Sequence, residues 1–181
     1  MISSIIILII VVISITILIF TNKNNDIGAI VDRDTIYDIN DYSNYQTTLE
    51  NSDEEKLELL IMKLPLNWKE RQFEIDKDTI KINYDITYKN IIKAYNDKIY
   101  VKEAMINIAS VIFTIISDVD SVEIKYNDYN FSISRKKLQK AYNISNFDEM
   151  LKNDNWNKTV SKKLKNDDFV NNTFSLFKKG Y

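Results

Sequence analysis

The sequence predicts an α+β fold: an N-terminal transmembrane helix, then a small antiparallel sheet packed against two main helices, with short C-terminal helices. Three observations predict it. Residues 2–20 contain no charged side chain and are mostly Ile, Val and Leu. Two later segments, about 53–63 and 102–117, place apolar residues at helical spacing. Two further segments alternate apolar and polar residues around a short polar turn, which is typical of β-hairpins.

The chain divides by composition into four predicted parts. Residues 1–20 form a transmembrane anchor, 21–48 a polar juxtamembrane linker, 49–152 the α+β domain and 153–181 a C-terminal helical tail. Within the linker, the apolar stretch "IGAIV" (27–31) is long enough for a short strand.

The apolar N-terminus has the length that crosses about 30 Å of hydrocarbon as a helix. A cleaved signal peptide begins with basic residues and has an apolar core of about 7–15 residues. This N-terminus has no Lys or Arg and a longer apolar run, so we expect an uncleaved anchor held in the lipid bilayer through residues 2–20. A single short span commonly exports the hydrophilic domain behind it. We therefore expect a single-pass protein of the cell membrane with its C-terminal domain outside, and a cytoplasmic-facing domain as the alternative.

The first helix of the domain has sharp end signals. Ser52 and Glu55 have the spacing of a capping box, so the helix should run from about Asp53 to Lys63. Pro65, the single proline, disfavours helical geometry at the residue before it and should end the helix. Leu64 and Leu66 should face the core on either side of that turn.

The remaining elements follow in order. "RQFEIDKDTIKINYDITY" predicts a first hairpin, 102–117 a buried helix, and "SVEIKYNDYNFSIS" a second hairpin. "KNIIKAYNDK", before the buried helix, is a polar connection with some helical character. Ser134 should cap a helix through "RKKLQKAY", and another helix should begin near Phe147. Trp156, Val160 and Leu164 form an i, i+4, i+8 stripe that could dock a last helix on the domain.

Composition argues against several chemistries. The chain has no Cys and no His, so disulfides, thiolate metal sites and the commonest general base are excluded. The net charge of −2 gives no general attraction for nucleic acid. We expect no enzyme activity, no cofactor and no metal, and no nucleic acid partner.

Two clusters carry residue types that could be catalytic or metal-binding. "SISRKK" places Ser132 and Ser134 near Lys136 and Lys137, a Ser–Lys arrangement. Because it lies where a strand becomes a helix, a capping role for Ser134 is preferred. Asp118 and Asp120, with Glu123 close by, could hold Ca²⁺. No third ligand is evident, so a solvated turn is preferred.

Two features, a lysine-rich segment and Trp68, could form binding surfaces. "KTVSKKLK" carries four lysines within 158–165, and these could approach anionic lipid or cell-wall polymer. A solvated face opposite the Trp156 stripe is preferred. Trp68 could be an exposed contact, but an indole more often packs, and we expect packing. Gly28 and Gly180 lie too far apart to cradle phosphate together.

Several segments resemble a known family. "LIMKLPLNW", "IKINYDI", "NIASVIFTIISDVDSVEI" and "NFSISRKKLQKAY" are similar to domain-of-unknown-function family 4825, over about residues 51–142. The resemblance implies a membrane-anchored or secreted domain of low-GC bacteria, sometimes associated with membrane sensors. The order of elements also resembles the GerMN type of sporulation and germination domain. Neither resemblance implies a catalytic residue.

The sequence therefore predicts a single-pass membrane protein with a small extracytoplasmic domain. That domain would bind or sense at the bacterial cell envelope through a protein partner, without enzymatic activity. The alternative is a cell-envelope enzyme or wall-polymer binder that uses exposed carboxylates or lysines.

Overall fold

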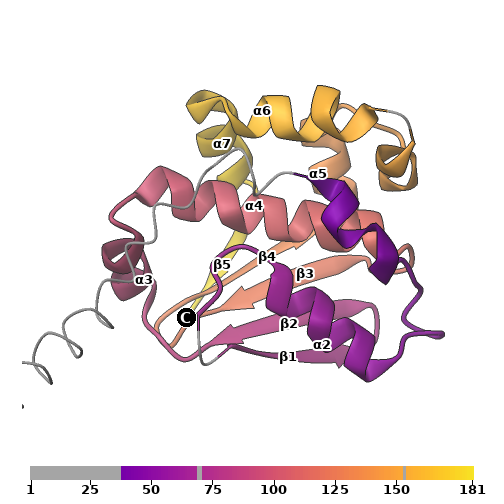
Figure 1. Cartoon of the computed structure of the whole chain (residues 1–181). Coiled ribbons are helices and arrows are strands. Elements are labelled where there is room, and N and C mark those ends of the chain that lie inside the picture. Colours follow the sequence, from indigo (N-terminus) through magenta and orange to yellow (C-terminus); the bar gives the residue numbers. More distant parts are fainter. Residues whose placement is uncertain (1–37, 69–70, 153) are drawn as a thin grey trace, which may run out of the picture. The chain divides into compact units, whose positions relative to one another are not determined.

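The computed structural model describes residues 38–68, 71–152 and 154–181. The predicted anchor and the predicted strand at 27–31 lie outside these residues. The described part is α+β, with a five-stranded mixed sheet in the order β1-β2-β3-β4-β5 (Figure 1). The strands are β1 (Arg71–Asp76), β2 (Thr79–Tyr84), β3 (Ser121–Lys125), β4 (Asn130–Ser134) and β5 (Lys178–Gly180). The longer helices are α2 (Glu54–Lys63), α3 (Tyr88–Tyr95), α4 (Lys98–Ile115), α5 (Arg135–Tyr142) and α7 (Asp167–Phe174). The short ones are η2 (Ile39–Tyr45), η3 (Phe147–Leu151), η4 (Asn157–Ser161) and α6 (Lys162–Leu164).

Both predicted hairpins are confirmed. β1 pairs with β2 and β3 with β4, each pair antiparallel. The prediction of a wholly antiparallel sheet is wrong, because β2 and β3 are parallel. The chain leaves the C-terminal end of β2, crosses back through α3 and α4, and enters β3 at the opposite end of the sheet, beside the start of β2, as a parallel pair requires.

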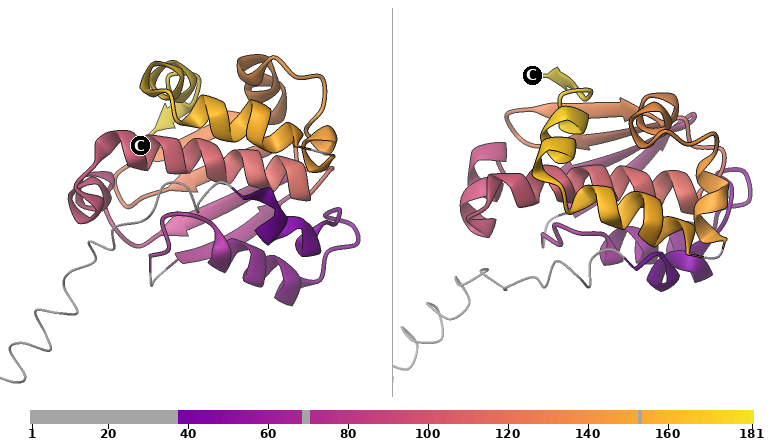
Figure 2. Two further views of the ribbon diagram at one scale, coloured as in Figure 1. Left: turned by 45° about the horizontal axis from the view of Figure 1, so that its top comes forward. Right: turned by 90° about the horizontal axis from the view of Figure 1, so that it is seen from above.

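The sheet has one apolar and one polar face. On the apolar face, Ile80, Ile82 and Tyr84 of β2 are buried beside Val122 and Ile124 of β3. Helices α2 and α4 cover this face, and α6 and α7 lie on the far side of α4 (Figures 1 and 2). We call the opposite face the open face, since no helix of the described segments covers it (Figure 2).

The long helix α4 is the centre of the core. Fifteen of its 18 residues are buried, because the sheet lies on one side and the C-terminal helices on the other. The prediction placed its start at Lys102, but it begins at Lys98. Asp97 causes the earlier start, since its carboxylate accepts hydrogen bonds from the backbone N–H groups of Ile99 and Tyr100.

The C-terminus of α4 is held by one arginine from another element. The Arg135 guanidinium, at the start of α5, donates to the carbonyl oxygens of Phe113, Ile116 and Val119 at 2.6–2.7 Å. Its carbon lies 5.1 Å from the centre of the Phe113 ring. Arg135 thus satisfies carbonyl groups that a helix end leaves unpaired, and it places a positive charge where the helix dipole favours one.

Helix α2 has the predicted extent but a different cap. The N-cap is Asp53, whose side chain accepts from the backbone N–H of Glu55. The capping box on Ser52 is therefore wrong, because the Ser52 hydroxyl donates instead to the carbonyl of Leu49. The stop at Pro65 is confirmed: the preceding residue, Leu64, has extended backbone geometry.

The turn after α2 packs as predicted. Leu64 and Leu66 are both buried in the core. Leu66 has a φ of 56°, in the left-handed region that a side chain rarely adopts. Trp68 is partly buried and packs against the core, so the prediction of packing is confirmed.

Parts of the predicted linker and of the predicted helical tail pack into the domain. η2 lies within the predicted linker, yet Ile39 and Tyr42 are buried in the core. In the tail, the stripe of Trp156, Val160 and Leu164 is buried as predicted. The last residues form β5, which pairs with β4 and was not predicted.

The described residues contain no helix long and apolar enough to cross a membrane.

Candidate binding groove

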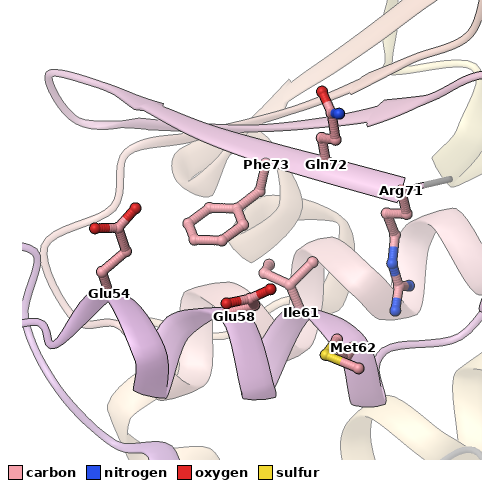
Figure 3. A pocket seen from close by; sticks show the side chains of 7 residues that line it. All are labelled: Glu54, Glu58, Ile61, Met62, Arg71, Gln72 and Phe73. Atoms are coloured by element: carbon pink, nitrogen blue, oxygen red, sulfur yellow. The ribbon is translucent and has the colours of Figure 1, made fainter.

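A groove lies between α2 and β1 at the edge of the sheet (Figure 3). Its volume is about 320 Å³. Seven residues line it: Glu54, Glu58, Ile61, Met62, Arg71, Gln72 and Phe73. Four come from α2 and three from β1. Both elements were predicted from the sequence. We refer to it as the α2–β1 groove.

The floor of the groove is apolar. The Phe73 ring points from β1 towards α2, and Ile61 points up beneath it (Figure 3). Ile61 is buried, whereas the Met62 side chain is 57% exposed at the rim. Ile75, two residues after Phe73 on the same face of β1, is 42% exposed. The floor and rim therefore offer apolar surface to solvent beside a strand.

The two ends of the groove differ in charge. Glu54 and Glu58 point towards β1 from the first turns of α2, and Arg71 lies at the opposite end (Figure 3). Both glutamates are exposed, and neither forms an ion pair with the described residues. Arg71 donates to the carbonyl oxygens of Leu64 and Pro65 at 3.1 and 3.3 Å, so its charge is held at the C-terminal end of α2.

The acidic residues on the other side of β1 are neutralised. On the open face, Lys81 lies 3.1 Å from Glu74 and 2.8 Å from Asp76. Lys81 lowers the pKa of Asp76 through this hydrogen bond and charge. Lys125 is 3.9 Å from the same Glu74. Among the described residues, the carboxylates near β1 that form no ion pair are therefore Glu54 and Glu58 of the groove.

The outer edge of β1 is available for pairing. β1 is a terminal strand of the sheet, and no described segment pairs with the side that faces away from β2. A terminal strand presents alternate backbone N–H and C=O groups that have no ladder partner. The groove thus lies beside the first three residues of β1, a six-residue strand whose outer edge can accept another strand.

The serine–lysine cluster has structural roles. The Ser134 hydroxyl caps α5 by accepting from the backbone N–H of Lys137, as expected from its position. Ser132 lies on the open face, opposite Glu123 of β3. Lys137 Nζ donates to the carbonyl of Leu176. The Lys137 amine is therefore directed to a backbone carbonyl and not to either serine hydroxyl.

The acidic cluster is dispersed. The Asp118 carboxylate accepts from the backbone N–H of Leu49 at 2.7 Å. Glu123 accepts from the Asn130 side chain on the open face. Asp120 contributes backbone groups, which bond to Asp78 and Arg135. Across residues 38–68, 71–152 and 154–181, no group of three or more acidic side chains is placed to hold a metal ion.

The lysine-rich segment is partly tied to the fold. Lys163 donates to the carbonyl of Tyr142 at 2.6 Å and lies over the rings of Tyr142 and Phe169. Burial lowers the pKa of Lys163. Lys158 lies 3.9 Å from Asp154 in an exposed pair. The lysines opposite the Trp156 stripe thus include one that packs and others in solvent.

The groove was not predicted from the sequence. Two signals were present. First, Leu59 and Met62 are apolar residues on the exposed side of α2. Phe73 and Ile75 also lie on a strand whose own burial is incomplete, in contrast to β2. These signals indicate apolar surface that the core does not bury, but they do not show that α2 and β1 lie side by side.

No protein-family model, curated protein or solved structure matches this chain. The resemblance to family 4825 stays a prediction.

Proposed function

We propose that this is a single-pass membrane protein whose α+β domain lies outside the cell membrane and binds a protein partner through the α2–β1 groove, without catalysis. The observation that carries the proposal is the groove itself. Within the described part of the chain, it combines apolar surface, two carboxylates without an ion pair and a strand edge without a partner strand. Extended peptides commonly bind in this way, because the strand edge supplies backbone hydrogen bonds and the adjacent pockets select side chains.

The anchor in this proposal rests on the sequence of residues 2–20. Nineteen consecutive uncharged, mainly aliphatic residues match the hydrocarbon thickness. An anchored binding domain would keep its partner at the membrane surface.

The topology can be tested by single-cysteine labelling, since the natural chain has no cysteine. Lys140 is exposed on α5, so Lys140→Cys gives one accessible thiol. We expect a membrane-impermeant maleimide to label this variant in intact cells as fully as in lysed cells. Labelling only after lysis would place the domain in the cytoplasm and refute the topology.

The binding surface can be tested by site-specific photo-crosslinking of the full-length protein in cells. A photoreactive residue at Met62 should form a covalent product with one discrete partner. The same residue at Lys140 should not form it, because Lys140 is exposed but does not line the groove. The proposal fails if Met62 gives no product, or if both positions give the same products.

A further inference from the structure

The chemistry of the groove restricts the partner further. We infer that the α2–β1 groove accepts an extended segment that adds to the edge of β1, antiparallel to it. The segment carries a Lys or Arg opposite Ile75 and a large apolar side chain two residues later. This inference rests on the proposed function and specifies the chemistry of that partner.

Strand addition follows from the geometry of β1. The free edge extends over six residues, Arg71 to Asp76, which is about 20 Å of strand. The side chains of Phe73 and Ile75 lie on the face that α2 covers, as the pairing of Phe73 with Ile82 shows. Alternate side chains of an added strand would therefore enter the groove, and the others would lie over the open face.

The basic side chain follows from the charges. Glu54 and Glu58 face the groove and form no ion pair with any described residue, whereas Glu74 and Asp76 on the open face already pair with Lys81. A Lys or Arg opposite Ile75 would lay its aliphatic stem along Ile75 and Phe73. Its charged end would then reach the two glutamates. An acidic side chain in the same place would face two like charges.

The apolar side chain follows from the other half of the groove. Along β1 from Phe73 towards Arg71, the groove passes over Ile61 and Met62 (Figure 3). These residues and Phe73 would cover a Leu, Ile or Val two residues after the basic one in an antiparallel strand. At the far end of the groove, Arg71 already donates to the carbonyl oxygens of Leu64 and Pro65.

A peptide experiment tests this inference on the full-length protein in lipid nanodiscs. The probe is a fluorescein-labelled heptapeptide, Thr-Lys-Thr-Val-Thr-Val-Thr, and its counterpart has Glu in place of Lys. Fluorescence polarisation should show at least tenfold tighter binding of the Lys peptide. The preference should fall below threefold in the double variant Glu54→Gln, Glu58→Gln. The double variant Glu50→Gln, Glu55→Gln, which changes the charge equally outside the groove, should retain it.

Backbone methylation of the Lys peptide tests strand addition directly. Methylating the amides on one edge of the peptide should abolish binding, and methylating those on the other edge should leave it within threefold. Equal binding of the Lys and Glu peptides, or equal effects of the two methylation patterns, would overturn the inference. If Met62 still captures a partner in cells, only this inference fails, whereas loss of that capture refutes the proposed function.

A second copy of the chain is the competing occupant. Sedimentation of the full-length protein in nanodiscs as a dimer that Ile75→Lys converts to a monomer would assign the edge to self-pairing and overturn the inference. We expect a monomer at concentrations where the Lys peptide binds.

Discussion

Replacing Arg135 should strongly destabilise the fold, because this partly exposed side chain holds the C-terminal end of α4. Its guanidinium makes three charge-assisted hydrogen bonds to backbone carbonyls at 2.6, 2.7 and 2.7 Å. Such a bond contributes about 1.5–3 kcal/mol. Because the three act together and water can reach part of the site, the total should be below their sum. We expect Arg135→Met, which keeps much of the side-chain volume, to lower the free energy of unfolding by about 3–5 kcal/mol.

A lysine at the same position should rescue only part of the loss. An ammonium group keeps the charge near the C-terminus of α4 but lacks the planar fork that reaches three separate carbonyls. Arg135→Lys should therefore cost about 2 kcal/mol. The neighbouring Lys136 is exposed, and Lys136→Met serves as the control for loss of one surface charge.

Urea denaturation followed by tryptophan fluorescence measures these effects, since Trp156 is buried in the fold. The expected order of stability is wild type and Lys136→Met, then Arg135→Lys, then Arg135→Met. A loss below about 1 kcal/mol for Arg135→Met would refute the reasoning that this residue holds the end of α4.

Three further predictions concern a turn, a cap and alkaline pH. Lys77 has a φ of 58° in the β1–β2 turn, so Lys77→Gly should stabilise the fold by about 0.5–1 kcal/mol in urea titrations; destabilisation would contradict this. Asp97→Ala should cost about 1–2 kcal/mol, and Asp97→Asn much less, because the side chain accepts from two N–H groups of α4; equal losses would exclude a capping role. Burial raises the pKa of Tyr42 and Tyr88 to about 12. The folded state thus holds protons that the unfolded chain releases from about pH 10. Stability should be full below about pH 10 and fall as the pH rises towards 12. Urea midpoints, measured with phenolate absorbance, should show the decline, and a constant midpoint from about pH 9 to 11.5 would contradict it.

The elements that sequence reasoning located are those with a local physical cause. Alternation predicted four strands because a strand between core and solvent repeats every two residues. Pro65 predicted the end of α2 because the ring restricts the backbone of the residue before it. The cap of α2 was misassigned by one position, since Ser52 and Asp53 are neighbouring residues with similar capping ability.

The features that were missed depend on contacts between distant segments. The parallel pairing of β2 with β3 is not encoded in the alternation of either strand. β5 has three residues, two of them lysines, and its place beside β4 depends on Gly180: a Cβ there would lie 1.9 Å from the Asn130 side-chain oxygen. The groove depends on the separation of α2 and β1, which no local pattern reports.

The parallel pair in the middle of the sheet also has a kinetic consequence. Each hairpin closes through a short turn, but β2 and β3 meet only after the chain between Tyr84 and Ser121 has folded across the sheet. Closing a longer loop costs more entropy, and non-local pairing slows folding. The two hairpins should therefore form early. The pairing of β2 with β3, which requires the packing of α4 against the sheet, should limit the folding rate. Changes in the hairpin turns, which are already formed at that step, would then alter mainly the folding rate, whereas changes in contacts made after it would act mainly on unfolding.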